Sequence, residues 1–164
     1  MTMTRKALRG GKGSTIVEFA MVFPFLLLLI FGVLDFGFYF FVQHSLQFAT
    51  REGVRLALVG RTIADPANPS VQLSREASIV RTIQNKASVA VRGSDVTISI
   101  YPVDATFADP ANWLATQDAG LPGSYMRVKS RYTYRFITPL VAAFVPGKSR
   151  VIEVQATYRN ELFN

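Results

Sequence analysis

The amino-acid sequence predicts an α+β protein in which a long N-terminal transmembrane helix continues into a small external domain. Three observations support this fold class. One apolar run, residues 19–42 of the 164-residue chain, is long enough to span a bilayer. An amphipathic helical pattern follows over residues 75–91. Apolar and polar residues then alternate with the period of strands, so we expect an antiparallel sheet of three or four strands beside the second helix.

The apolar run contains 24 residues and one charged side chain, that of Asp35. A helix of this length covers about 36 Å, more than the roughly 30 Å of a bilayer's hydrocarbon core. The buried helix of a soluble domain is the alternative, but such a helix is rarely apolar around its whole circumference. We therefore expect a membrane span, kinked or locally opened at Pro24. Asp35 is expected near the outer interface, either at headgroup level or paired with another group.

The first thirteen residues carry only basic charge. Four lysines and arginines and no acidic residue lie in residues 1–13, which places the N-terminus in the cytoplasm and the domain across the membrane. A secretory signal peptide has a shorter apolar core that ends at a small-residue cleavage site. The net charge is +7, and without these four residues it is +3, from 14 basic and 11 acidic residues. Much of the basic charge is therefore a topology and targeting signal, and we do not expect a nucleic-acid partner.

A carboxylate at the start of the membrane span, that of Glu18, requires an explanation. Its simplest role is that of a side chain reaching the cytoplasmic interface. A more specific role follows if the chain is cleaved after Gly13, because Glu18 then becomes the fifth residue, about one helical turn from the new amine of Ser14. In an apolar bundle, such an amine and carboxylate can pair between neighbouring subunits and offset each other's desolvation.

The stretch from Gly13 to Phe19, GSTIVEF, resembles the processing site of type IV prepilins, in which a glycine precedes a hydrophobic segment with glutamate at mature position five. Residues 17–37, VEFAMVFPFLLLLIFGVLDFG, and residues 49–57, ATREGVRLA, are similar to the TadE-like pseudopilins of the tight-adherence (Tad/Flp) pilus system. A weaker similarity lies in ATYRNE at residues 156–161.

This resemblance implies a pilin-like fold and a minor structural or assembly role in a Tad/Flp-type pilus. It also implies cleavage by a prepilin peptidase between Gly13 and Ser14, with Glu18 and Phe19 serving recognition or assembly. Cleavage after Gly11 would put Glu18 at position seven, so the spacing selects Gly13. The implied partners are the peptidase, other pilin or pseudopilin subunits, the assembly platform and membrane lipid. The implied location is the inner membrane, with a periplasmic domain and with incorporation into an extracellular pilus left open.

The transmembrane and juxtamembrane helix is expected to cover residues 14–60, after the leader of residues 1–13 and before a domain of residues 61–164. Small residues recur every fourth position in its second half and allow a close helix–helix approach. This face packs either on the chain's own domain or on a partner, and both alternatives stay open. The residues concerned are Ser45, Ala49, Gly53 and Ala57.

Within the domain, Ser74 is the expected N-cap of the second helix. Residues 102–124 form a long connection whose single tryptophan, Trp113, either anchors the loop to the core or belongs to a binding loop. The strand over residues 125–136 has one apolar and one basic face, and we expect the basic face to be exposed, with Glu153 of a later strand as a cross-strand partner. Contact of this face with acidic subunits, anionic headgroups or single-stranded nucleic acid is the alternative. The basic residues are Arg127, Lys129, Arg131 and Arg135.

A short apolar segment, residues 137–145, is too short to span a membrane and forms either an exposed interaction patch or a plug of the core.

The sequence gives no reason to expect an enzyme, a cofactor or a metal. It has no cysteine and one histidine, and no nucleophile–base pair or phosphate-binding loop is evident. The favoured function is thus a structural pilus component. The alternative is an uncleaved single-pass protein of the inner membrane whose external domain binds an envelope partner.

Overall fold

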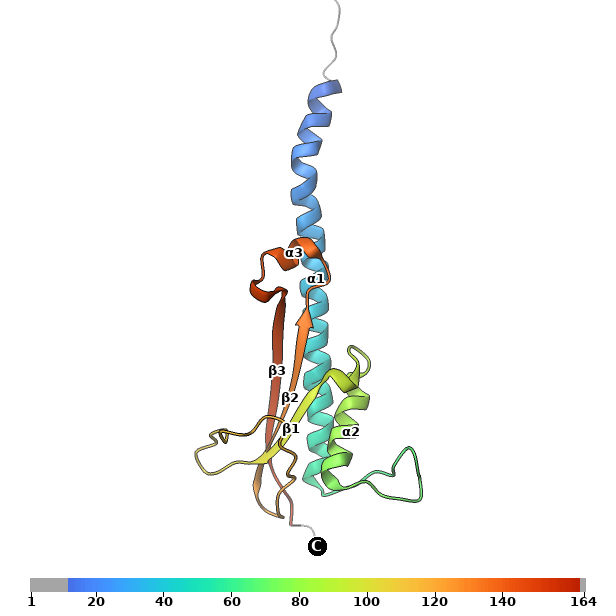
Figure 1. The fold of residues 1–164 in the computed structure, drawn as a ribbon, viewed down its shortest axis with the longest axis vertical. Coiled ribbons are helices and arrows are strands. Elements are labelled where there is room, and N and C mark those ends of the chain that lie inside the picture. The colour runs from blue at the N-terminus through green and yellow to red at the C-terminus, as the bar shows by residue number, and fades with distance from the viewer. Residues whose placement is uncertain (1–11, 163–164) are drawn as a thin grey trace, which may run out of the picture.

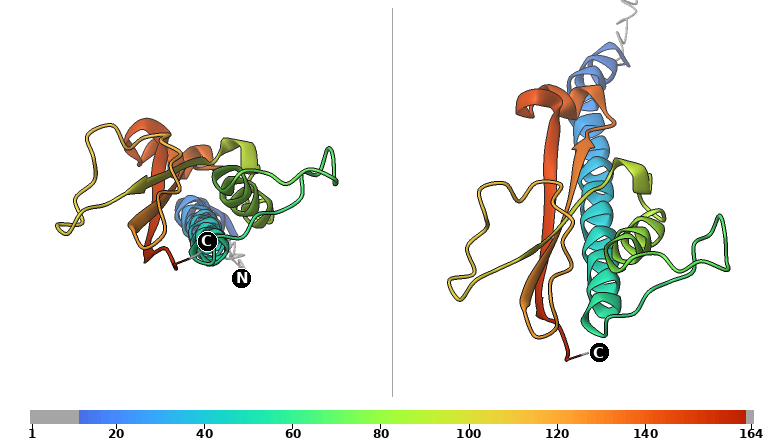
Figure 2. Two further views of the ribbon diagram at one scale, coloured as in Figure 1. Left: turned by 90° about the horizontal axis from the view of Figure 1, so that it is seen from below. Right: turned by 60° about the horizontal axis from the view of Figure 1, so that its bottom comes forward.

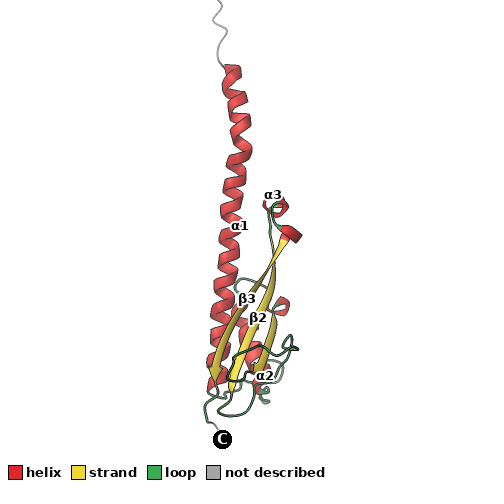
Figure 3. Cartoon of the chain, turned by 90° about the vertical axis from the view of Figure 1, so that its left-hand side faces the viewer, coloured by secondary structure: helices red, strands yellow, loops and turns green. Residues whose placement is uncertain are grey.

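A computed structural model describes residues 12–162 of the chain. Its dominant element is helix α1 (Lys12–Leu58), which runs for 47 residues with Pro24 inside it. Figure 1 shows the first half of α1 projecting alone beyond the rest of the protein, and Figure 3 shows the same from the side. Residues 1–11 of the predicted basic leader lie outside the described residues.

The projecting half of α1 has the properties of a membrane span. Among the described residues, one helix is long and apolar enough to cross a bilayer. An 18-residue stretch of it has a mean hydropathy of 2.6, and none of that stretch is buried. Large apolar side chains point outward along it, including Phe25 at 73% and Leu29 at 64% exposure. A bilayer or neighbouring helices would cover such a surface, and its length and composition indicate a single-pass membrane protein.

The domain is built on a sheet of three antiparallel strands in the order β1-β2-β3. The strands are β1 (Thr97–Pro102), β2 (Tyr125–Arg135) and β3 (Ser149–Arg159). The long β2–β3 pair runs alongside α1 (Figure 1). The α+β fold with a long helix, a second helix and a small antiparallel sheet is therefore confirmed.

The second half of α1 and the helix α2 (Arg75–Ala87) pack together and on one face of the sheet (Figure 2). Ser74 caps α2 as predicted, its side chain accepting a hydrogen bond from the N–H of Ala77 at 3.1 Å. The hydroxyls of Thr50 in α1 and Ser130 in β2 lie 2.8 Å apart within the core. The core is formed by buried apolar residues of all these elements, among them Val42, Leu46, Ile79, Ile83, Ile100, Met126 and Val128.

Helix α2 ends earlier than the sequence pattern predicts, at Ala87 and not near Val91. The chain turns there and returns through η1 (Gly93–Asp95) toward β1. A Cβ atom at Gly93 would lie 2.6 Å from the carbonyl oxygen of Gln84, so the returning chain touches the end of the helix. This close return, which periodicity does not encode, sets the end of α2.

The segment between β2 and β3 lies beside the middle of α1 (Figures 1 and 3). It contains α3 (Pro139–Ala143) and η2 (Pro146–Lys148). The apolar residues 137–145 divide between the core and the surface. Val141 and Ala142 are buried at 5% exposure, whereas Ile137 and Phe144 are 68% and 73% exposed.

Candidate functional site

The residues predicted at the processing site begin α1. Gly13 and Ser14 lie in its first turn, and Glu18 and Phe19 follow in the exposed part of the helix. Phe19 is 61% exposed, and its ring centroid lies 5.1 Å from that of Phe23. The predicted cleavage position therefore lies in the first turn of a helix with outward-facing apolar side chains and one carboxylate near its start.

The small-residue face of α1 lies against α2 of the same chain. Ala49, Gly53 and Ala57 are buried, and Ser45 is half-buried. A Cβ atom at Gly53 would lie 2.4 Å from Cγ1 and 2.8 Å from Cδ1 of Ile83. The glycine thus permits the close approach of the two helices, and this part of α1 is occupied by the chain's own domain.

Asp35, at the boundary between the projecting and the packed half of α1, is only 2% exposed. Its Oδ1 and Oδ2 atoms accept hydrogen bonds from the backbone N–H groups of Ile137 and Thr138, each at 3.0 Å. The Tyr134 hydroxyl donates to the Asp35 carbonyl at 3.2 Å. The predicted pairing of Asp35 is therefore confirmed, and its partners are backbone amides of the β2–β3 connection.

The basic face of β2 is exposed as predicted only toward the end of the strand, where Arg131 is half-buried and Arg135 is exposed. Arg127 and Lys129 are 8% and 5% exposed, because the long connection before β2 covers them. The carboxylate of Asp109 in this connection accepts hydrogen bonds from both side chains and, at 2.7 Å, from the Tyr101 hydroxyl.

Trp113 completes this covered cluster and anchors the connection to the sheet. The Lys129 Nζ atom lies 4.4 Å from the centroid of the Trp113 ring. Lys129 also contacts Glu153 at 3.2 Å, which confirms the predicted cross-strand partner. The role of Asp109 was not predicted, because this residue lies in an irregular loop without periodicity. Arg127 and Lys129 are therefore neutralised and covered, and this part of the face is not open to nucleic acid.

Acid is expected to loosen this cluster. Burial acts to raise the pKa of Asp109, but its three hydrogen-bond donors outweigh that effect and lower the pKa from 3.8 to about 2. A carboxyl group with a lowered pKa stabilises the fold fully above its unfolded pKa and loses that contribution as the pH falls through its folded pKa. Trp113 fluorescence should therefore change between about pH 4 and pH 2. Replacing Asp109 by asparagine should remove this transition, and an unchanged transition would contradict the assignment.

Asn160, which the sequence analysis did not single out, lies in the C-terminal stretch of weaker similarity. Its Nδ2 atom donates to the carbonyls of Ala119 and Leu121 at 3.0 and 2.9 Å. The neighbouring N–H of Glu161 donates to the carbonyl of Leu58 at 3.1 Å. This stretch thus ties the long connection to the end of α1, which is a structural role.

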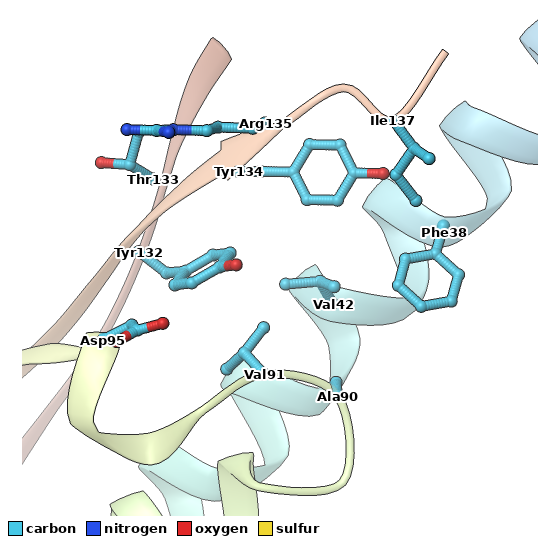
Figure 4. Close-up of a pocket in the computed structure, with 10 residues that line it drawn as sticks. All are labelled: Phe38, Val42, Ala90, Val91, Asp95, Tyr132, Thr133, Tyr134, Arg135 and Ile137. Atoms are coloured by element: carbon cyan, nitrogen blue, oxygen red, sulfur yellow. The ribbon is translucent and has the colours of Figure 1, made fainter.

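An open groove of about 470 Å³ lies between α1 and the end of β2. Figure 4 shows Tyr132 and Tyr134 pointing from β2 toward α1, while Thr133 and Arg135 point to the other side of the strand. Apolar side chains such as Phe38 and Val91 form much of its lining. Within residues 12–162, no group of three histidine, aspartate or glutamate side chains is placed to hold a metal ion.

Residues 13–55 match the family model of the TadE-like proteins. Neither the curated proteins nor the solved structures give a match to this chain. The matched segment contains the predicted processing site, the whole membrane span with Asp35, and the part of α1 with Ala49 and Gly53. The resemblance to TadE-like proteins is therefore confirmed over this segment, and it indicates a structural component associated with a Tad pilus.

Proposed function

We propose that this TadE-like chain is a minor pilin-like subunit, a structural or assembly component of a Tad/Flp-type pilus that a prepilin peptidase cleaves between Gly13 and Ser14. The observation that carries the proposal is the first half of α1. It is apolar and outward-facing, it lies in the TadE-like segment, and its one carboxylate before Asp35 is that of Glu18, five residues after Gly13.

Cleavage changes what this helix can do. Before cleavage, the basic leader holds the N-terminus at the cytoplasmic face and α1 stays in the inner membrane. After cleavage, Ser14 carries a free amine about one turn from Glu18. That amine can pair with Glu18 of a neighbouring subunit, where apolar surroundings make an unpaired charge costly. The pairing sets the register between adjacent helices.

The packed half of α1 limits where subunits can meet. Its small-residue face is covered by α2, so helix packing between subunits falls to the projecting half. Residues such as Leu29 and Val33, at 64% and 66% exposure, supply that contact surface. The domain then lies on the periplasmic side, attached to the end of the packed helix.

Cross-linking tests whether the projecting half meets other pilus subunits. The chain has no cysteine, so Leu29→Cys and Leu121→Cys each create a unique site, in the span and in the distal domain. Both positions are exposed, at 64% and 77%. We expect Leu29→Cys to cross-link to pilin subunits that carry a cysteine in their own spans, and Leu121→Cys to give little of this product. If only Leu121→Cys forms cross-links, and these are to an envelope protein, the result would favour the alternative of an anchored binding module.

Substitution of Glu18 should separate processing from assembly. We expect Glu18→Ala to be cleaved normally but to be lost from sheared pili or assembly complexes, because the Ser14 amine then lacks its partner. Glu18→Asp keeps the charge and should retain part of the assembly. Immunoblots of membrane and pilus fractions measure both steps, and normal incorporation of Glu18→Ala would refute the pairing.

A further inference from the structure

We propose that the β2–β3 tip, defined as residues 136–148, is a second membrane contact, which rests in the outer-leaflet interface beside the span of α1 and takes anionic lipid headgroups at its rim. The inference requires α1 to span a membrane, and it holds whether or not the chain enters a pilus. It concerns the membrane-embedded form of the protein.

The height of the tip is fixed by its attachment to α1. The Asp35 carboxylate holds the amides of Ile137 and Thr138, and the rings of Phe36 and Phe136 lie 5.7 Å apart. Asp35 lies 17 residues after Glu18, roughly 26 Å along a helix, against a hydrocarbon core of about 30 Å. With Glu18 near the inner interface, the tip therefore lies at the outer edge of the hydrocarbon region.

Exposed phenylalanines on α1 lie at the same level. Phe38, Phe40 and Phe41 follow within two turns of Asp35 and are 45% to 53% exposed. Phenylalanine is favourable on a membrane-facing surface and also occurs on the apolar side of segments that lie in the interface. These rings lie on the domain side of Asp35, so the apolar surface of α1 extends to the level of the tip.

The tip has the side chains of an interfacial element. Val141 and Ala142 are buried, whereas Ile137 and Phe144 are 68% and 73% exposed. Three exposed basic residues lie where β2 ends and β3 begins: Arg135, Lys148 and Arg150. Apolar side chains at an edge with basic neighbours are typical of segments that lie in the interface of an anionic membrane.

The backbone of the tip also suits a dehydrated setting. An amide without a hydrogen-bond partner is strongly disfavoured in hydrocarbon. The N–H groups of Ile137 and Thr138 are bound by Asp35. Those of Phe136, Ala142, Phe144, Val145 and Lys148 donate to carbonyls within residues 138–148. Pro139 and Pro146 have no N–H group. A loop built this way can approach lipid without exposing these donors.

Quenching by brominated lipid tests the contact on the full chain. In a Trp113→Phe background, Phe144→Trp and Leu121→Trp place one tryptophan at the tip or in the distal domain, at positions of 73% and 77% exposure. The variants are reconstituted into vesicles of phosphatidylcholine and phosphatidylglycerol, with or without brominated acyl chains. For Phe144→Trp we expect roughly half or more of the emission to be quenched, since interfacial segments lie about 5–10 Å into the headgroup and acyl boundary. Leu121→Trp should be unaffected.

Equal, weak quenching of both variants would overturn the proposal. A second outcome would also overturn it. If raising the protein concentration abolishes the quenching of Phe144→Trp but leaves its emission blue-shifted, a second copy of the chain, and not lipid, covers the tip. If the tryptophan variant does not fold, a spin label on Ile137→Cys reports depth in the same vesicles. Lys148→Glu combined with Arg150→Glu should reduce quenching only when phosphatidylglycerol is present, which identifies the headgroup contribution.

Discussion

Leucine at position 53 is expected to destabilise the external domain strongly. The Cβ position of Gly53 is already 2.4 Å from Cγ1 of Ile83, so the leucine side chain has no room between α1 and α2. Overpacking of a core costs about 1–3 kcal/mol and sometimes more, and we expect about 3 kcal/mol here. Domains have a free energy of unfolding of only about 5–15 kcal/mol. Urea unfolding of the full chain in micelles, followed by circular dichroism, measures the loss.

Three further variants separate the clash from other effects. Gly53→Ala should cost less, about 0–2 kcal/mol, because alanine also gains about 1 kcal/mol of helix propensity over glycine. Gly37→Leu is the matched control, since nothing lies within 4 Å of a Cβ atom at Gly37 on the same helix. Ile83→Ala should partly rescue Gly53→Leu by opening space, so the two changes should not be additive. Equal stability of Gly53→Leu and Gly37→Leu would show that α1 and α2 are not in close contact.

Alanine at position 35 is expected to release the β2–β3 tip from α1 while the sheet stays folded. The substitution leaves two amides, those of Ile137 and Thr138, without their acceptor. An unsatisfied buried donor costs about 1–3 kcal/mol. If the opening free energy falls by about 2 kcal/mol, amide exchange should speed up roughly 30-fold. Hydrogen exchange of peptides from the tip measures this.

The control is Asp95→Ala, which removes an exposed aspartate that lines the neighbouring groove. It should leave exchange at the tip unchanged. Unchanged exchange in Asp35→Ala as well would contradict the attachment. The same hydrogen bonds explain how an aspartate is tolerated here, because a carboxylate within a span costs about 2.5–3.5 kcal/mol on insertion scales unless it is paired.

Much of the fold follows from local patterns in the sequence. The length and apolarity of α1, the Ser74 cap of α2 and the alternation in β2 and β3 are each encoded within one segment. The Glu153 partner required one further assumption, that the two long strands pair, which brings it opposite Arg131. The other elements needed no knowledge of which distant segments meet.

Other features depend on contacts between segments that are far apart in the chain. Asp35 binds amides 102 and 103 residues later, and no side-chain pattern marks a backbone donor. Asp109 lies in a loop without periodicity, so the burial of Arg127 and Lys129 beneath it was not predictable. The spacing around Gly53 predicted a close helix contact but could not decide between the chain's own domain and a partner.

The mature N-terminus tests the central claim most directly. The protein is recovered from membranes of cells with and without a prepilin peptidase, and its intact mass and N-terminal peptide are measured. The account predicts a chain that begins at Ser14 only when the peptidase is present. A chain that begins at Met1 or Thr2 in both cells would contradict it and leave an uncleaved, membrane-anchored binding module.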